Sequence, residues 1–378
     1  MFLAQRYAFL TLLLAALLSA GRIAAQSQDY LREARIRYEF KDYAGALEVL
    51  NQDVASNPQW TEAYNLRGQT LAAMGNLNMA IKDFGQAVAL FPQYIDAYNG
   101  RGLALTLQGE YDKAIEDFNR CLALSVTGRD VYLYNRANCE LRQQHYIEAI
   151  ADYTESLRIN PNLEVALNNR GTAKIGLRDT TGALDDYLKA VHVNPSYVQG
   201  YMNRALLEES GGDYNAAVED FRQCVRWSPE EARAYVELGA LDEEYLDDQT
   251  GALQAYDKAI AVQPNFADAY NDRGTLKVRQ TRYKKALRDF NKAISLNPFN
   301  ADFYYNRGMA RKNLGKDKGA LADFSAAIDM DSSYAAAYYN RGMTEIRLGN
   351  VKAACPDLTA ALDKGAAKAS EGLQKYCH

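Results

Sequence analysis

The segment ADFYYNRGMARKNLGKDKGALADFSAAIDMDSSY, residues 301–334, is one copy of a unit that repeats along nearly the whole chain. Its Asn-Arg-Gly triplet returns at 169–171 and 340–342, and a related Asp-Arg-Gly stands at 272–274. The small residue that ends this motif recurs every 34 residues, with a spacing of 35 in two places. It occupies ten positions: Ala34, Gly68, Gly102, Ala137, Gly171, Ala205, Gly239, Gly274, Gly308 and Gly342. Such a period predicts a stack of similar structural units.

The other recurring positions predict that each unit is a hairpin of two α-helices. An alanine stands twelve residues after the small residue in most copies, and a large apolar or aromatic residue follows four residues later. We expect the small residue to face this alanine, so that two antiparallel helices approach closely. Seven of the eight prolines share one position at the end of the unit. Proline cannot continue a helix there, so it separates one unit from the next.

This pattern resembles the tetratricopeptide repeat, with arginine in place of the leucine that the family carries before the small residue. The resemblance implies an all-α, right-handed α-solenoid of about ten helix-turn-helix repeats, with a concave groove lined by the first helix of each repeat. It also implies a role in protein assembly, without naming the partner. We expect the repeats to span 26–368 and a C-terminal capping helix to occupy 369–378.

The first 25 residues have the pattern of a secretory signal peptide. Arg6 precedes an apolar run from Phe9 to Leu18, and small residues extend to Ala25. We predict cleavage after Ala25 and a periplasmic or secreted location. The alternative is an uncleaved anchor, but the run is shorter than the ~20 residues needed to span a bilayer. After removal of the signal, no remaining segment has the length and apolarity to span a membrane.

Internal comparison of the repeats predicts ion pairs within hairpins. Eight repeats carry arginine before the small residue, and the same eight carry aspartate before the large residue of the second helix. Repeats one and seven lack both residues. We therefore predict that arginine and aspartate of one repeat bond each other, with the arginine stem packed where leucine usually lies. The alternative is an arginine row that binds anions. The pairs are Arg67 with Asp83, Arg101 with Asp117, Arg136 with Asp152, Arg170 with Asp186, Arg204 with Asp220, Arg273 with Asp289, Arg307 with Asp323, and Arg341 with Asp357.

The five cysteines fall into two groups. Cys121, Cys139 and Cys224 lie at helix positions typical of small buried residues, and we expect them to be core thiols. A turn at Gly365 would bring Cys355 and Cys377 to matching heights on antiparallel helices, where an exported protein would form a disulfide. The alternative is two free thiols. Pro356, inside the second helix of repeat ten, should kink or shorten that helix.

Two features of the expected groove are candidates for binding. One first-helix position carries asparagine in five repeats: Asn135, Asn169, Asn203, Asn306 and Asn340. A similar asparagine ladder holds peptide backbone in O-linked GlcNAc transferase, because an amide offers both a donor and an acceptor. The alternative is that each asparagine bonds the loop of the preceding repeat. The second feature is an acidic patch around repeat seven, a docking position for a basic segment: Glu237, Glu243, Asp268 and Asp272. A solvated charged face is the alternative, and the spacing does not suit calcium.

The composition disfavours enzymes and nucleic-acid binding. Formal net charge is -5, which opposes a grip on phosphate backbones, and only three histidines occur, far apart. We expect no catalytic residues, no metal and no cofactor. The leading prediction is a non-enzymatic scaffold or adaptor that binds a protein or peptide partner in the groove. The alternative is a structural subunit of an envelope assembly that uses its convex face or its ends. The partner, the pathway and the oligomeric state do not follow from the residues.

Overall fold

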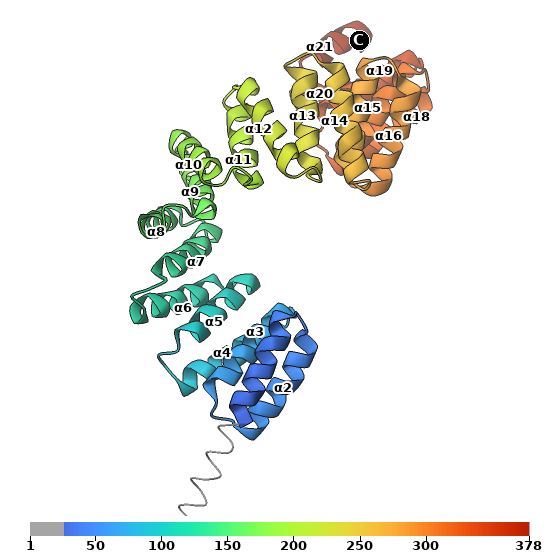
Figure 1. Cartoon of the computed structure of the whole chain (residues 1–378). Coiled ribbons are helices and arrows are strands. Elements are labelled where there is room, and N and C mark those ends of the chain that lie inside the picture. The colour runs from blue at the N-terminus through green and yellow to red at the C-terminus, as the bar shows by residue number, and fades with distance from the viewer. Residues whose placement is uncertain (1–25, 378) are drawn as a thin grey trace, which may run out of the picture. The chain divides into compact units, whose positions relative to one another are not determined.

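A computed structural model describes residues 26–377, and these residues contain helices, turns and loops but no strands (Figure 1). The predicted signal peptide, 1–25, lies outside the described residues. Residues 26–39 are helical. The helices that follow are α2 (Tyr43–Ser56), α3 (Thr61–Ala73), α4 (Leu77–Leu90), α5 (Ile95–Gln108), α6 (Tyr111–Leu124), α7 (Arg129–Arg142), α8 (Tyr146–Ile159), α9 (Glu164–Gly176), α10 (Thr180–Val193), α11 (Val198–Ser210), α12 (Tyr214–Trp227), α13 (Ala232–Glu244), α14 (Gln249–Val262), α15 (Ala267–Arg279), α16 (Tyr283–Leu296), α17 (Ala301–Asn313), α18 (Asp317–Met330), α19 (Ala335–Arg347), α20 (Val351–Asp363) and α21 (Ala369–Tyr376).

Each repeat is a hairpin in which an odd-numbered first helix packs against the even-numbered second helix that follows it. The fold is therefore the all-helical repeat stack that the sequence predicts. The chain divides into two compact units, one ending at Pro195 and one beginning at Ser196, and each is described by itself. Within each unit, first helices of successive repeats also contact one another, as α5 contacts α7 and α13 contacts α15. We call the line of first helices in a unit the first-helix row.

The small residue of each first helix faces the large residue of its own second helix. A Cβ atom added to Gly308 would lie 2.7 Å from the ring of Phe324, and one added to Gly68 would lie 2.9 Å from Phe84. Glycine leaves room for the aromatic ring to lie close to the first-helix backbone in these repeats. Phe324 is fully buried as a result. In repeat ten the predicted alanine is among the nearest neighbours, since a Cβ atom added to Gly342 would lie 3.1 Å from the backbone oxygen of Ala354.

The turn inside each hairpin has one residue in the left-handed region. Gly315 has φ 69° and Gly349 has φ 84°. Five repeats place another residue at the same position, among them Arg178 with φ 62° and Thr281 with φ 57°. These residues adopt a conformation that costs roughly 1 kcal/mol outside glycine. The turn geometry is thus conserved within the chain although the residue is not.

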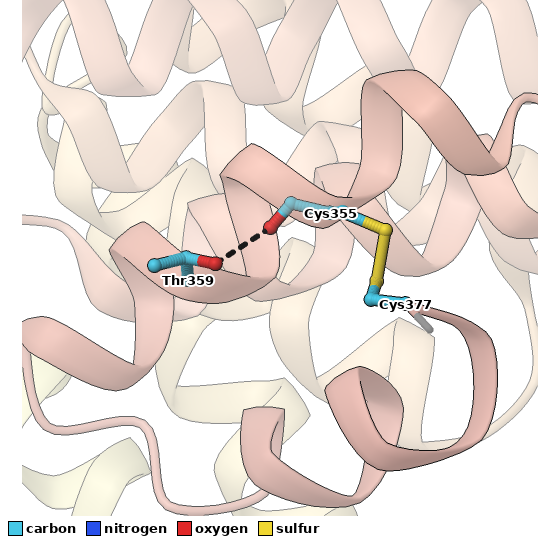
Figure 2. The surroundings of a disulfide bond; sticks show 3 residues. All are labelled: Cys355, Thr359 and Cys377. Carbon is cyan, nitrogen blue, oxygen red and sulfur yellow. Dashed lines mark hydrogen bonds between the residues drawn. A yellow bond between two sulfur atoms is a disulfide. The ribbon is translucent and has the colours of Figure 1, made fainter.

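The last hairpin is fastened to the C-terminal helix. Cys355 on α20 and Cys377, which follows α21, are joined by a disulfide bond (Figure 2). α21 also buries Ala369 against Leu358 and Ala361 of α20. α20 continues through Pro356 and is 13 residues long, where α18 has 14. The three other cysteines are free and buried, and burial raises the pKa of Cys121 and Cys224 to about 12.

Candidate functional site

The eight predicted arginine–aspartate pairs are brought together, each as a two-bond contact between the helices of one hairpin. Nε of Arg101 donates to Oδ2 of Asp117 at 2.8 Å, and Nη2 donates to Oδ1 at 2.7 Å. The Asp117 side chain is 5% exposed, so its charge is removed from solvent together with that of its partner. Hydrogen bonding to Asp117 raises the pKa of Arg101. The other seven pairs have the same two bonds, and Nε of Arg307 in addition contacts Oδ1 of Asp323.

These arginines are structural because two further contacts occupy them. In six repeats the guanidinium lies over the ring of a tyrosine three residues earlier, as Arg307 lies 5.3 Å from the centroid of Tyr304. Arg307 also donates to the side chain of Asn291 on α16, the second helix of the preceding repeat. The tyrosine was missed at the sequence level, although its fixed distance from the arginine is a signal that could have found it. Each of the eight arginines is paired with its own aspartate, which disfavours the interpretation of these arginines as an anion-binding row.

A third residue beside some pairs changes their charge balance. Lys174 and Lys277 place their ammonium groups 2.8 and 2.6 Å from the paired aspartates of repeats five and eight. In repeat six the same position holds Glu208, four residues after Arg204. Burial, and then the charge of Asp220, raise the pKa of Glu208 to about 7. Oε2 of Glu208 is buried and accepts no hydrogen bond from the described residues.

The five asparagines bond neighbouring side chains. Nδ2 of Asn135 donates to Asn99 at 3.2 Å, and Nδ2 of Asn306 donates to Asn271 at 2.9 Å. Nδ2 of Asn169 likewise donates to Asn138 at 3.0 Å. In each case the partner lies on the first helix of the preceding repeat. The expected bond to a preceding loop is therefore wrong for these three residues, which join first helices instead.

The remaining two asparagines are also engaged. Asn340 donates to the hydroxyl of Tyr305 at 3.1 Å and accepts from Nζ of Lys312 at 2.8 Å. Asn203 accepts from Gln199 at 2.9 Å. Asn135 and Asn340 are buried as well. These contacts occupy amide groups that a peptide backbone would need, which weakens the peptide-ladder interpretation.

The acidic patch lies on α13 and α15 of the second unit, around a surface hollow of about 210 Å³. Glu243 and Asp272 line this hollow, together with Glu244, Tyr256, Thr275, Ala240 and Arg279. Glu237 and Asp268 do not line it, but their charges help to raise the pKa of Asp272. Burial is the larger cause of that rise, and the pKa of Asp272 is about 6. We use the name acidic hollow for this surface hollow together with the five acids in it and around it: Glu237, Glu243, Glu244, Asp268 and Asp272.

Two basic residues contact this group: Arg233 lies 3.3 Å from Glu237, and Arg279 contacts Glu243. The sequence separates acidic repeat seven from basic repeat eight, but Nη1 of Arg279 lies 3.1 Å from Oε1 of Glu243. The hydroxyl of Tyr256 donates to the other oxygen of Glu243 at 3.2 Å. The side chain of Glu243 is 8% exposed and well held, whereas Asp272 accepts only from Asn271, at 3.1 Å. Asp272 thus has less compensation for its negative charge than Glu243 has.

Residues 26–377 hold no cluster of three or more histidine, cysteine or acidic side chains with the geometry of a metal site. Over the same range, no helix combines the length and the apolar character needed to cross a membrane.

The fold and the surface define a helical-hairpin repeat protein whose first helices form a continuous row in each unit. Family models described as "tetratricopeptide repeat" match residues 95–125, 131–163, 198–231 and 313–370, and models described as "TPR repeat" match 68–109 and 277–315. Together they cover more than half of the chain, which belongs to the tetratricopeptide repeat family. Proteins of this family are generally non-enzymatic scaffolds that bind proteins or peptides.

Three solved structures illustrate the similarity. A subunit in the APC/C hetero-tetramer Cut9–Hcn1 is 13% identical, with 93% of this chain and 90% of that chain covered and a TM-score of 0.50. MamA is 26% identical over 46% of this chain and 93% of that chain, with a TM-score of 0.41. YrrB, described as a TPR protein with an unusual peptide-binding site, is 21% identical over 49% of this chain and 95% of that chain, with a TM-score of 0.42. No curated protein matches the chain.

Proposed function

We propose that this chain is a non-enzymatic scaffold outside the cytoplasm, and that it holds a basic, extended segment of a partner protein at the acidic hollow of α13 and α15. Family membership supports the scaffold role. The signal-like sequence of residues 1–25 supports the location. The observation that carries the binding mode is Asp272, a largely buried carboxylate at the hollow with one neutral donor and several acidic neighbours.

The physical argument rests on uncompensated charge. Asp272 is ionised above pH 6, while burial and its acidic neighbours make that charge unfavourable. A lysine or arginine of a partner would relieve this repulsion at the moment of binding, which makes the site selective for cations. The acidic face would also increase the rate of encounter with a basic segment, and salt would reduce this effect.

Binding should depend on pH because Asp272 titrates near the physiological range. A bound cation stabilises the ionised form, so binding is strongest above pH 6 and weakens as pH falls through the pKa of Asp272. An exported protein that passes from neutral to acidic surroundings would release a basic partner for this reason.

The test is a titration of the chain beginning at Gln26 with a fluorescent lysine–serine peptide, followed by anisotropy at low salt. A glutamate–serine peptide of equal length is the ligand control. We expect the lysine–serine peptide alone to bind, and we expect the double variant Glu237→Gln with Asp272→Asn to weaken its affinity roughly tenfold, the effect of ~1.4 kcal/mol. Glu219, an exposed acid on second helix α12, provides the matched control Glu219→Gln. A loss of binding free energy in Glu219→Gln that is half of the loss in the double variant would show that every removed charge counts equally, and it would refute the site.

A further inference from the structure

One buried position of the second helix carries a charge only in repeat one. Three residues after the large residue of the second helix, every other repeat has alanine, cysteine or serine. Repeat one has Asp53 there. The equivalents are Ala87, Cys121, Ser156, Ala190, Cys224, Ala259, Ala293, Ala327 and Ala361. An aspartate at a position that otherwise takes small, mostly apolar residues requires a specific explanation.

Asp53 is fully buried and has no charged partner among the described residues. Its exposed fraction is 0%, neither carboxyl oxygen accepts a hydrogen bond of good geometry, and the one nearby donor is the neutral hydroxyl of Ser27. Burial raises the pKa of Asp53, and the nearby hydroxyl of Ser27 opposes this rise. A buried carboxyl without a partner is among the most unfavourable groups in a folded protein. Residues 26–377 therefore supply no charged group to this carboxylate.

The other repeats show what this position faces. Ser156 donates to the backbone oxygen of Asp130 at 2.8 Å, and the thiol of Cys121 donates to that of Ile95 at 3.6 Å. Both acceptors lie 26 residues earlier, in the first turn of the first helix of the same repeat. The same offset from Asp53 gives Ser27, which is 1% exposed and lies beside it. Asp53 thus faces the beginning of the described part of the chain, next to Gln26.

We propose that Asp53 binds the α-ammonium group of Gln26 once the chain is cut after Ala25, so that removal of the signal peptide completes the core of repeat one. The proposal rests on cleavage after Ala25, which is a sequence prediction, and does not depend on the acidic hollow. Hydrolysis of the Ala25–Gln26 peptide bond turns a neutral amide N–H into an ammonium group with three donors and a positive charge.

The ammonium group would donate a hydrogen bond to the Asp53 carboxylate, and the two charges would compensate each other. A positive charge at the N-terminal end of a helix is unfavourable next to the helix dipole, and a carboxylate beside it reverses that effect. The carboxylate gains a charged donor in a dry position, where such bonds are strongest. Gln26 adjoins Ser27, and consecutive Cα atoms are about 3.8 Å apart, so the amine is within reach of a small movement of the chain end.

The experiment is a four-protein cycle followed by thermal unfolding at pH 7. One chain begins at Gln26 with a free, uncyclised amine verified by mass spectrometry, and the other carries a glycine–serine extension before Gln26. Each is made with Asp53 and with Asp53→Ala, which installs the commonest residue of this position and should fold. We expect Asp53→Ala to lower the Tm of the chain that begins at Gln26 and to raise the Tm of the extended chain. Equal changes in both backgrounds would overturn the proposal.

Two controls sharpen the result. Asp29 lies on the helix of residues 26–39, as Gln26 does, but its side chain is exposed. Asp29→Ala should therefore shift the Tm of both chains equally. The α-amine has an ordinary pKa near 8, and pairing raises it. The advantage of the chain that begins at Gln26 should therefore be complete near pH 7, decrease at acidic pH as Asp53 is protonated, and vanish as pH rises through the raised pKa of the amine. An advantage that persists at pH 11 would contradict the ion pair. N-terminal sequencing of the exported protein must also return Gln26, and a different first residue would refute the assignment.

Discussion

Replacing Glu208 should stabilise the protein, and the chain itself supplies the reason. Residues at the equivalent position in repeats five and eight, Lys174 and Lys277, contact the paired aspartates with a positive charge. Glu208 instead presents a carboxylate to Asp220, and its buried Oε2 has no hydrogen-bond partner in the described part of the chain. Arg204, the nearest cation, is 3.8 Å from Oε1 and already bound to Asp220. Glu208→Gln removes the repulsion with little change of shape.

The magnitude follows from the pKa of Glu208. Burial and Asp220 raise it from 4.5 to about 7, and each unit corresponds to ~1.4 kcal/mol between protonation states. Solvent screening at the partly open edge of the hairpin reduces this, so we expect a gain of about 2 kcal/mol in the free energy of unfolding at pH 8. In a unit of this size that is on the order of 4–8 °C in Tm.

The pH dependence gives the sharper test. The folded chain binds more protons than the unfolded chain between pH 4.5 and 7, so the wild-type protein loses stability as pH rises through this range. Glu208→Gln abolishes that loss. Calorimetry should therefore show a large Tm difference between variant and wild type at pH 8 and almost none at pH 4.5. Glu140, at the same position in repeat four, accepts from His145 at 2.8 Å, so Glu140→Gln should not stabilise. A Glu208→Gln difference that is equal at both pH values would refute the reasoning.

Three further changes test the hairpin. Asp323→Asn leaves the half-buried cation Arg307 without its buried counter-ion and should cost about 3 kcal/mol in chemical denaturation, whereas a surface aspartate would cost less than 1 kcal/mol. Thr281→Gly relieves the left-handed turn and should raise Tm, with a gain of about 1 kcal/mol, and Gly315→Thr should reverse it. Cys377→Ser opens a disulfide that spans 22 residues and should destabilise the last hairpin by roughly 3 kcal/mol, seen as faster amide exchange in α21 than in α19.

The hairpins and their ion pairs could be predicted because the repeats act as an internal alignment. Arg307 and Asp323 are sixteen residues apart. In repeats one and seven, neither of the two equivalent positions carries the arginine or the aspartate. Joint loss of two charges implies contact, and the contact lies within one hairpin, whose geometry the period already determines. The disulfide could be predicted for the same reason, since Cys355 lies on α20 and Cys377 directly follows α21, the adjacent helix.

Contacts between repeats could not be predicted in the same way. The partner of Asn135 is Asn99, and Arg279 reaches Glu243 from the next repeat. Both contacts depend on how far and at what angle one hairpin is rotated on the next, which the period alone does not specify. The residue with positive φ in the turn of each hairpin could not be predicted for another reason. Only half of its positions are glycine, and residues such as Thr281 give no signal for it.

Asp53, Glu208 and Asp272 are three acids that depart from the repeat pattern and have raised pKa values. Asp272 occupies the position of the bridging asparagines, such as Asn306. Asp272→Asn restores that residue and removes a charge that its surroundings disfavour. It should therefore raise the free energy of unfolding by about 1 kcal/mol above pH 6.

If Asp272 were only a departure from the repeat pattern without a function, this substitution would raise the free energy of unfolding without any loss of binding. If the acidic hollow binds a basic segment, the same substitution must weaken that binding while it raises Tm, because the unfavourable charge is the one that the ligand neutralises. The two measurements on one variant therefore separate the interpretations. A Tm gain above pH 6 with unchanged affinity for the lysine–serine peptide would remove Asp272 from the binding surface. A Tm gain with reduced affinity would show that this departure from the repeat is retained for binding at the expense of stability.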